Sequence, residues 1–541
     1  MKLYQKIRYI VLGLAVLAIS SCASFDDINT DPNRPVVVQT PGILTWAQRD
    51  MAFIYYDSWQ GLRMNGVIAQ QWTQRVYTDE DRYSFAARTS TVANYFNRTY
   101  TFAERLNQII KINEDDPISA AVYGDNKLQI ATVKILKAWL VFQNAETFGD
   151  VPYTEANDVF NNPTPKYDKQ EFIYKDLIRV LKEVNTSLQG VTRGWTKGDV
   201  MLGGNPEKWR RFANSLRLAI AMRMSNVEPA FSAAEANAAI ADGVMRDNGD
   251  NAVVKFIGMG APNQSAKYET YSSRMDFLPS WQFVNLLHGR DDDNIGFKNP
   301  FSGIFDPRFI QFVQSPADQR AGLTPRVDAL PMGLANIDNT QVWNTLPPTT
   351  RITYGPTSGR IDDILPKPVQ ATFWSTFMDY PNVALMMAER QNNDRGHFES
   401  AVKASMDVWG VPKADADAYV AAVMEKFDEA SDAVKFEMII TQKYIHNFAH
   451  FDQESLFEFR RTEYPKSVVL PGQQTGNVRT VNGVERTYKF LPMDASTTFL
   501  QRMFYPDTED TFNKENKNDA IASMGGNTQY IPLYYSKKYK K

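Results

Sequence analysis

Apolar residues recur at helical spacing through much of the chain. Between Pro206 and Ser225 they stand three or four positions apart: Trp209, Phe212, Leu216, Ile220 and Met224. Polar side chains fall on the opposite face: Arg210, Arg211, Asn214 and Arg217. Because an α-helix has about 3.6 residues per turn, this pattern predicts an amphipathic helix that buries one stripe against a neighbour.

Other stretches predict more helices of the same kind. Gln129–Phe142 is apolar nearly all round, which is typical of a central helix buried on most sides. A third stripe is formed by Ile173, Leu177, Val180, Leu181 and Val184, and further helices are expected from Tyr380, over 414–427 and over 431–448. Trp139 and Trp209 lie on such stripes and are expected in the core. The sequence therefore predicts a mostly α fold, a scaffold of tetratricopeptide-like helix hairpins, although no clean 34-residue repeat is visible.

The helical pattern stops between Val244 and Ser375. Twelve of the 28 prolines fall within 245–375, and few long periodic runs remain apart from Phe277–Leu287. A long irregular region carried by a rigid scaffold is typical of a binding surface. We therefore expect a loop-rich, ligand-binding half at about 244–375.

The N-terminus has the pattern of a secretory signal. Lys2, Lys6 and Arg8 precede an apolar run of ten residues, and Ile19-Ser20-Ser21-Cys22 places small residues before a cysteine. Ten helical residues cover about 15 Å, which is too short for the roughly 30 Å of a bilayer core. We expect cleavage before Cys22 and lipidation of Cys22, so that the mature protein is anchored to the membrane. An ordinary signal peptide followed by a chance cysteine is the alternative.

Composition excludes several classes of protein. Cys22 is the only cysteine among 541 residues, which excludes disulfides, cysteine-ligated zinc and cysteine catalysis. The signal holds three of the 59 Lys and Arg residues and no acid, which leaves 56 basic against 62 acidic side chains and argues against a nucleic-acid binder. No later segment is apolar enough to span a membrane. Aromatic residues make up 12% of the chain, which suits a core and equally suits stacking on a ligand.

These patterns divide the chain. The predicted signal covers 1–21, and a lipid-anchored tether with a polar N-terminal segment covers 22–40. A single domain is expected over 41–541. Within it the scaffold spans about 41–243 and 376–464, and an irregular C-terminal segment spans 465–541.

Several stretches, in order, resemble the SusD/RagB family of outer-membrane lipoproteins from Bacteroidetes. DINTDPN (27–33) resembles its N-terminal signature, and KYDKQEFIYKDLIRVL and EKWRRFANSLRLAIAMRMS resemble two of its helices. TQKYIHNFAHFDQESLFEFRRTEYP (441–465) and FYPDTEDTFNKENKNDAI resemble its C-terminal segments. Together they span essentially the whole chain. One departure is Ala388-Glu389-Arg390, where the family usually has Ala-Glu-Ala, which indicates a divergent subgroup.

The resemblance implies a location and a role. Members of this family are lipid-anchored at the outer membrane, exposed on the cell surface, and cover TonB-dependent transporters of the SusC type. They capture oligosaccharides, or in some cases peptides, for import, and they are not enzymes. The resemblance implies no cofactor.

Candidate ligand contacts follow from the chemistry of sugars, which needs flat aromatic faces and a few polar groups. Residues 53–102 hold twelve aromatics, and the polar context QQWTQRVYTDEDRYSF favours Trp72, Arg75, Tyr77 and Tyr83 as exposed residues. The irregular region adds Tyr268 and Tyr271 from SAKYETYSSRM. Trp343 and Trp374 are expected in loops. Burial in the core is the competing interpretation for each aromatic.

Other chemistries fit less well. His446 and His450 stand four apart, as metal ligands do on one helical face, but Asn447 stands where a zinc protease needs Glu, so a packed, hydrogen-bonded role is favoured. Asp27, Asn29 and Asp31 begin like a calcium loop, but Pro32 and Val38 break the pattern. DDDNIG (291–296) fails as a calcium loop at Ile295, and an acidic turn is the simpler interpretation. A surface glycosidase would require a carboxylate pair that the sequence alone does not locate.

Overall fold

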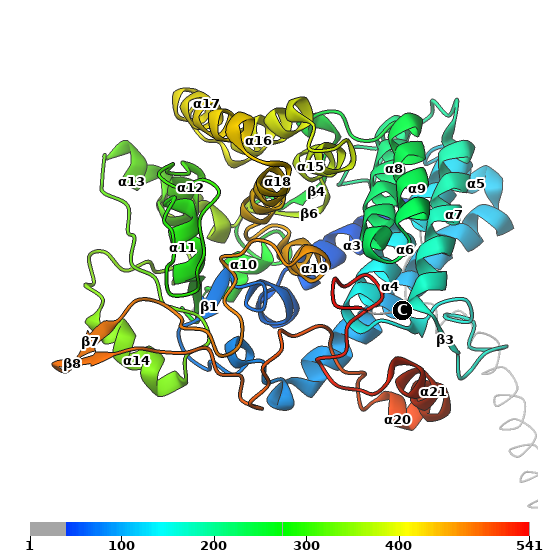
Figure 1. Ribbon diagram of the computed structural model, residues 1–541. Helices are drawn as coiled ribbons and strands as arrows, with labels where there is room; N and C mark the ends of the chain where they lie inside the picture. The colour runs from blue at the N-terminus through cyan, green and yellow to red at the C-terminus, as the bar shows by residue number, and fades with distance from the viewer. Residues whose placement is uncertain (1–38, 273, 540–541) are drawn as a thin grey trace, which may run out of the picture.

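Antiparallel helices packed side by side form one end of the molecule (Figure 1). The computed structural model of the protein describes residues 39–272 and 274–539; the predicted signal, Cys22 and the Asp27–Asp31 motif lie outside these residues. The helices of this end are α3 (Thr40–Ile54), α4 (Thr89–Asp115), α5 (Pro117–Ala121), α6 (Asn126–Phe148), α7 (Gln170–Leu188), α8 (Pro206–Arg223) and α9 (Pro229–Asp242). Each of α4, α6, α7 and α8 packs against the next long helix. The predicted mostly α fold with a helix-hairpin scaffold is confirmed.

Helix α6 is buried on most sides, as the sequence predicts. The Asp125 carboxylate caps its first turn by accepting from the Lys127 amide, and almost every residue from Ala138 to Phe148 is buried. The Trp139 indole N–H donates to the carbonyl of Phe377 at 3.0 Å, so the buried ring has its polar atom satisfied. Trp139 and Trp209 both lie in the core, which confirms that prediction.

Helix α8 has the predicted apolar stripe, but its polar face is not exposed. Asn205 caps the helix and Pro206 opens it. Arg211 pairs with Asp250 at 2.9 Å and Arg217 pairs with Asp242 at 2.6 Å, while Asn214 donates to the carbonyl of Gly243. The polar face is buried because α9 and the segment that follows it cover the face and supply hydrogen-bond partners.

Short elements separated by turns make up residues 244–375. The helices are α10 (Ala266–Thr270), α11 (Trp281–Leu287), α12 (Arg308–Val313), α13 (Pro316–Arg320) and α14 (Asn336–Thr345). Strand β1 (Trp72–Gln74) pairs antiparallel with β5 (Phe277–Pro279), and β4 (Ala252–Lys255) pairs with β6 (Trp374–Met378). Trp343 therefore lies in a helix and Trp374 opens a strand, and the expectation that both stand in loops is wrong.

The helices resume as predicted after residue 379. They are α15 (Tyr380–Arg390), α16 (Arg395–Trp409), α17 (Lys413–Glu429), α18 (Asp432–His446) and α19 (Asp452–Thr462). The C-terminal segment adds the hairpin of β7 (Arg479–Val481) and β8 (Val484–Arg486), then α20 (Glu509–Phe512) and α21 (Lys514–Met524). A two-residue pair, β2 (Val151–Pro152) with β3 (Tyr167–Asp168), follows α6. Within residues 39–272 and 274–539 no helix is long and apolar enough to cross a membrane.

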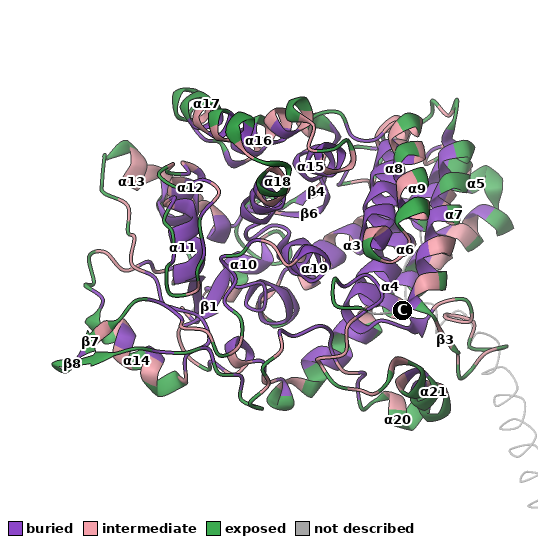
Figure 2. Cartoon of the chain, in the orientation of Figure 1, coloured by how far each residue is buried: buried purple, intermediate pink, exposed green. Residues whose placement is uncertain are grey.

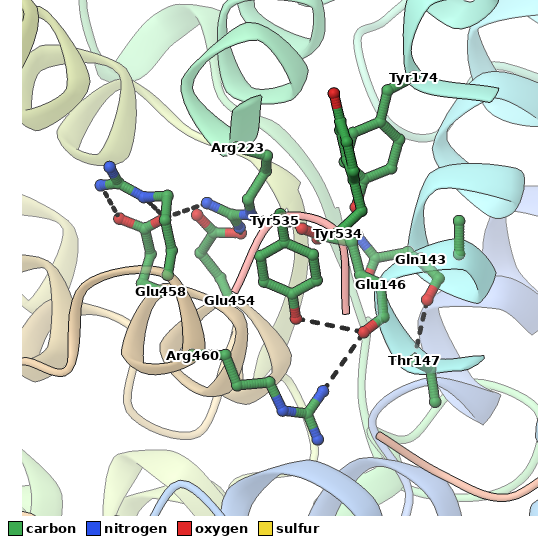
Figure 3. Close-up of polar contacts among 12 residues, drawn as sticks. Gln143, Glu146, Thr147, Tyr174, Arg223, Glu454, Glu458, Arg460, Tyr534 and Tyr535 are labelled. Carbon is green, nitrogen blue, oxygen red and sulfur yellow. Dashed lines mark hydrogen bonds and ion pairs between the residues drawn. The ribbon is translucent and has the colours of Figure 1, made fainter. Parts of the chain in front are cut away.

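A buried ion network joins the first group of helices to the last. The Arg223 guanidinium at the end of α8 pairs with Glu146 of α6 and with Glu454 and Glu458 of α19 (Figure 3). The network continues from α19: Lys443 of α18 pairs with Glu454 at 2.6 Å, and Arg461 pairs with Glu389 of α15 at 2.7 Å. Burial raises the pKa of Glu146, and the Arg223 guanidinium opposes that shift. Figure 2 shows the surrounding helices almost wholly buried.

Replacing Arg223 with Met is expected to lower the free energy of unfolding by about 3–5 kcal/mol, because it leaves the buried Glu146 carboxylate without a cation and takes one cation from Glu454 and Glu458. Urea unfolding followed by circular dichroism measures this change. The matched control is Arg179→Met, which removes an exposed arginine that also pairs with two carboxylates, Asp176 and Glu183. The control is expected to change stability by less than about 1 kcal/mol. Equal effects of the two substitutions would refute a special role for the network.

Candidate ligand-binding site

A hollow of about 270 Å³ opens beside Trp59. One wall comes from residues close to α3: Phe53, Asp57, Ser58, Trp59 and Arg63. The other wall comes from α10 and the chain up to β5: Ala266, Glu269, Thr270, Ser272, Arg274, Asp276 and Phe277. The helical scaffold and the irregular region therefore share this hollow.

Trp59 presents an aromatic face at the rim of the hollow. It lies in the π-helical turn η2 (Ser58–Gly66), and the Asp57 carboxylate caps this turn by accepting from the amides of Trp59 and Gln60. Most of the other residues of η2 are buried, which leaves Trp59 on the outer side with 51% of its surface exposed. A half-exposed indole with a fixed backbone suits stacking on a sugar ring.

Two arginines hold the Trp59 ring. The guanidinium carbon of Arg63 lies 4.4 Å from the ring centre, and that of Arg88 lies 5.8 Å from it. Both guanidinium groups pair with Glu80, whose carboxylate is fully buried and also accepts from the Gln74 amide. The buried carboxylate therefore fixes the cations, and the cations fix the indole, so the ring is ordered before any ligand arrives.

The carboxylates of the hollow have structural partners. Burial raises the pKa of Asp57 to about 6, although the amides of Gln60 and Trp59 oppose the shift. Asp276 pairs with Arg274 at 2.8 Å. The hollow therefore offers acceptors and donors for hydroxyl groups, and its Asp57 and Asp276 are already engaged by neighbouring groups.

Tyr77 is a second exposed aromatic residue, and it lies beside Arg274 of the hollow. It is 55% exposed, and the guanidinium carbon of Arg274 lies 5.2 Å from its ring centre. Its φ of +57° lies in the left-handed region, which is uncommon for an aromatic residue, and its amide donates to the Asn336 side chain at the start of α14. Backbone strain of this kind clusters at functional sites.

Arg75 and Trp343 lie further along the same face. Arg75 donates through Nε to the carbonyl of Met275, and its guanidinium carbon lies 5.5 Å from the Trp343 ring centre. Both side chains are partly buried. We call the six residues Trp59, Arg63, Arg75, Tyr77, Arg274 and Trp343 the aromatic surface; of the sequence candidates, it contains Arg75, Tyr77 and Trp343.

Trp72 and Tyr83, which the polar context placed outside, are buried. Trp72 has no exposed surface; its indole N–H donates to Asp452 and its ring stacks on Phe448 at 4.5 Å. Tyr83 is 2% exposed and packs edge-on against Phe490. The expectation that these two residues face solvent is wrong, because the polar residues beside them are themselves buried and hydrogen-bonded.

Tyr268, Tyr271 and Trp374 also pack inside. The Tyr268 hydroxyl donates to the carbonyl of Arg360, and the Tyr271 hydroxyl donates to the carbonyl of Phe277, and both rings are buried. The partly buried Trp374 packs against an aromatic cluster that includes Trp409, 5.4 Å away. For these residues the competing interpretation, burial in the core, fits the structure.

The sequence did not predict Trp59, Arg63 or Arg274 as residues of the site. Trp59 lies within the aromatic-rich stretch 53–102, and the adjoining Asp57-Ser58 is a typical capping signal that could have placed it at the surface. No sequence signal brings Arg274 to Tyr77, because that contact depends on the pairing of β1 with β5.

The two histidines form part of the core. His446 ends α18 and His450 lies in the turn beyond it, so they do not share one helical face. Their ligand atoms and that of Asp379 lie within 4.8 Å of one another. Ser405, Asp379, Thr376 and the carbonyl of His446 occupy the four ring nitrogens, and burial lowers the pKa of His450 to about 3. These contacts support the packed, hydrogen-bonded interpretation.

The acidic turn at 291–296 also has internal partners. Lys298 pairs with Asp293 at 2.7 Å and with Asp291 at 3.3 Å, and Asp292 accepts from the amide of Asn294. This arrangement agrees with an acidic turn.

Comparisons with known proteins give one family and several similar structures. Residues 32–484 match the model of the SusD-like family, which is described as starch-binding, associating with the outer membrane. A chitin-binding protein is 23% identical with a TM-score of 0.68, and covers 92% of this chain and 100% of its own. A chitin-binding SusD homologue from Flavobacterium johnsoniae is 19% identical with a TM-score of 0.66, and covers 92% and 98%.

A SusD homologue from Parabacteroides distasonis is 20% identical with a TM-score of 0.70, and covers 92% of this chain and 98% of its own. At these identities the structures show a shared fold. A comparison with curated proteins finds no match.

Replacing Trp72 with Ala is expected to destabilise the protein by about 3–5 kcal/mol, because it empties the space of a fully buried indole and removes its hydrogen bond to Asp452. Thermal unfolding measures the loss. A Trp72→Ala protein with the same melting temperature as the wild type would contradict the burial described above.

Replacing Trp59 with Ala is expected to leave the melting temperature almost unchanged and to weaken oligosaccharide binding at least about tenfold, which is about 1.4 kcal/mol. Calorimetric titration with a panel of oligosaccharides measures the affinity. Phe160→Ala is the control, since Phe160 is also an exposed aromatic but does not line the hollow. Unchanged affinity in Trp59→Ala would remove Trp59 from the site.

Proposed function

The chain belongs to the SusD-like family of starch-binding proteins that associate with the outer membrane, and from this premise we propose that it captures oligosaccharides at the cell surface for nutrient uptake. The observation that carries the proposal is the half-exposed Trp59, held by Arg63 and Arg88 at the rim of a hollow. An ordered aromatic face beside hydrogen-bonding groups is the arrangement that sugar rings require. The chitin-binding relatives support a glycan ligand.

We also propose how the protein is anchored and which protein receives the ligand. A lipid on Cys22 anchors the protein to the outer membrane, and a TonB-dependent transporter of the SusC type accepts the oligosaccharide. The sequence of the N-terminus supports the lipid anchor, and membership of the family supports association with the outer membrane. We propose capture without turnover, because the three carboxylates of the hollow have structural partners. Asp57 caps η2, Asp276 pairs with Arg274, and Glu269 accepts from the side-chain amide of Gln264.

Calorimetric titration of the soluble protein, beginning after Cys22, with starch-, chitin- and pectin-derived oligosaccharides tests the capture role. We expect saturable binding to at least one glycan class, with no shorter product detectable by chromatography. Binding of peptides and of no oligosaccharide would replace the proposal with peptide capture. Release of shorter sugars would replace it with a glycosidase.

A second experiment tests the route. In cells, Cys22→Ser is expected to abolish labelling with a clickable palmitate analogue and to release the protein from the outer-membrane fraction. Affinity purification of the wild-type protein from detergent-solubilised membranes is expected to recover a TonB-dependent transporter. Unchanged palmitate labelling of Cys22→Ser would refute the lipid anchor, and purification without any transporter would refute the partner.

A further inference from the structure

Two guanidinium groups lie over the Trp343 ring of α14, and a third arginine, Arg479, stands on the neighbouring strand β7. The guanidinium carbon of Arg351 lies 4.4 Å from the ring centre of Trp343, and that of Arg75 lies 5.5 Å from the same centre. The two cations are therefore no more than about 10 Å apart. Arg479 of β7 belongs to the same region, because β7 packs against α14.

These cations lack the carboxylates that other arginines of this face have. Arg63 and Arg88 share Glu80, and Arg274 has Asp276. Arg75 and Arg351 instead donate to the carbonyls of Met275 and Trp343. Among residues 39–272 and 274–539, no carboxylate oxygen lies within 4.0 Å of a guanidinium nitrogen of Arg75, Arg351 or Arg479. The Nε of Arg479 is buried and has no hydrogen-bond partner there.

One acid interacts with this group from nearby. Asp328 lies opposite Arg351 in a β-bridge, and its carboxylate accepts from the Thr350 hydroxyl. Burial lowers the pKa of Arg479, and the charge of Asp328 opposes that shift. Asp338 of α14 and Glu485 of β8 add negative charges, and Arg486, opposite Arg479 in the β7–β8 hairpin, adds a positive one, so the excess of positive charge is small.

The geometry favours an anion with flat, paired oxygens. Guanidinium groups present forked N–H donors that match carboxylate and sulfate groups, and they are more weakly hydrated than ammonium groups. Trp343 orders two of these forks by cation–π contact and fixes their position. Like charges held this close repel one another, and a bound anion removes that repulsion.

This guanidinium group is continuous with the aromatic surface. Arg75 and Trp343 belong to both, and the Tyr77 amide donates to Asn336 at the start of α14. Figure 1 shows α14 beside β7 and β8 at the end of the molecule away from the packed helices. An oligosaccharide stacked at Trp59 and Tyr77 would extend toward these cations.

We propose that Arg75, Arg351 and Arg479 bind the carboxylate or sulfate groups of an acidic glycan, so that the oligosaccharide captured by this protein is anionic. The inference rests on the proposed capture of oligosaccharides and adds the charge of the ligand. Uronic acids and sulfate esters share the required chemistry, and the test separates them.

Calorimetry with the soluble protein compares three hexasaccharides: an oligogalacturonide, its carboxyl-reduced neutral counterpart, and a heparin fragment. The inference predicts at least tenfold tighter binding of one acidic probe than of the neutral one, with an affinity that falls as salt rises. A uronate ligand favours the oligogalacturonide. Because heparin carries uronates as well as sulfates, a sulfated ligand is indicated only by a preference for the heparin fragment over the oligogalacturonide. Because this comparison uses the wild-type protein, it does not depend on the folding of any variant.

Arg351→Gln is expected to reduce the ratio of acidic to neutral affinity to near one. Arg326→Gln is the matched control, because Arg326 is exposed and donates to Thr353 on the neighbouring chain segment; it should preserve the ratio. Equal weakening of both probes by Arg351→Gln would indicate a structural role and overturn the inference.

The outcomes separate the two proposals. Neutral oligosaccharides that bind as tightly as acidic ones would overturn the acidic ligand and leave glycan capture standing. Failure of every oligosaccharide, acidic or neutral, would overturn both.

Discussion

The buried pairing of Arg223 with Glu146, Glu454 and Glu458 is the contact on which the rest of the structure depends. It joins α6 and α8, from the first half of the chain, to α19, which follows more than 200 residues later. A buried cation without its carboxylates is costly, so the two helical groups are held in one relative position. The irregular residues 244–375 lie between these two groups in sequence and pack into the same core. Arg308, for example, is fully buried and donates to Ser405 and Gln442 of the second group.

The aromatic surface is also held in place by a buried ion pair. A buried carboxylate, Glu80, holds Arg63 and Arg88, and these cations order the exposed Trp59. The exposed ring is thus tied to the core through charge. Ordering the ring in advance lowers the entropy lost on binding, which is an advantage for a protein that must take up a flexible oligosaccharide.

The sequence predicted the helices better than the site, for a physical reason. The stripes of α6, α7 and α8 follow directly from helical periodicity, and the family motifs lie on these same elements. Trp72 was placed outside because Gln70, Gln71 and Gln74 surround it; yet these amides are buried, and they donate to Val469, Tyr444 and Glu80. A polar neighbourhood predicts exposure only where no partner from a distant segment satisfies it. Trp59 was missed because its partners Glu80 and Arg88 reach it through tertiary contacts.

The pairing of β1 with β5 has a consequence for the order in which the protein assembles. The hollow beside Trp59 has both walls only after strand β1 (Trp72–Gln74) has paired with β5 (Phe277–Pro279). These two strands are about 200 residues apart in the chain. Contacts between distant segments form slowly, whereas the neighbouring helices α6 to α9 can pack as soon as each pair is complete. The scaffold would therefore form early in folding and the ligand surface late. The hollow would then stay incomplete until the chain as far as Pro279, about half of its length, had folded onto Trp72–Gln74.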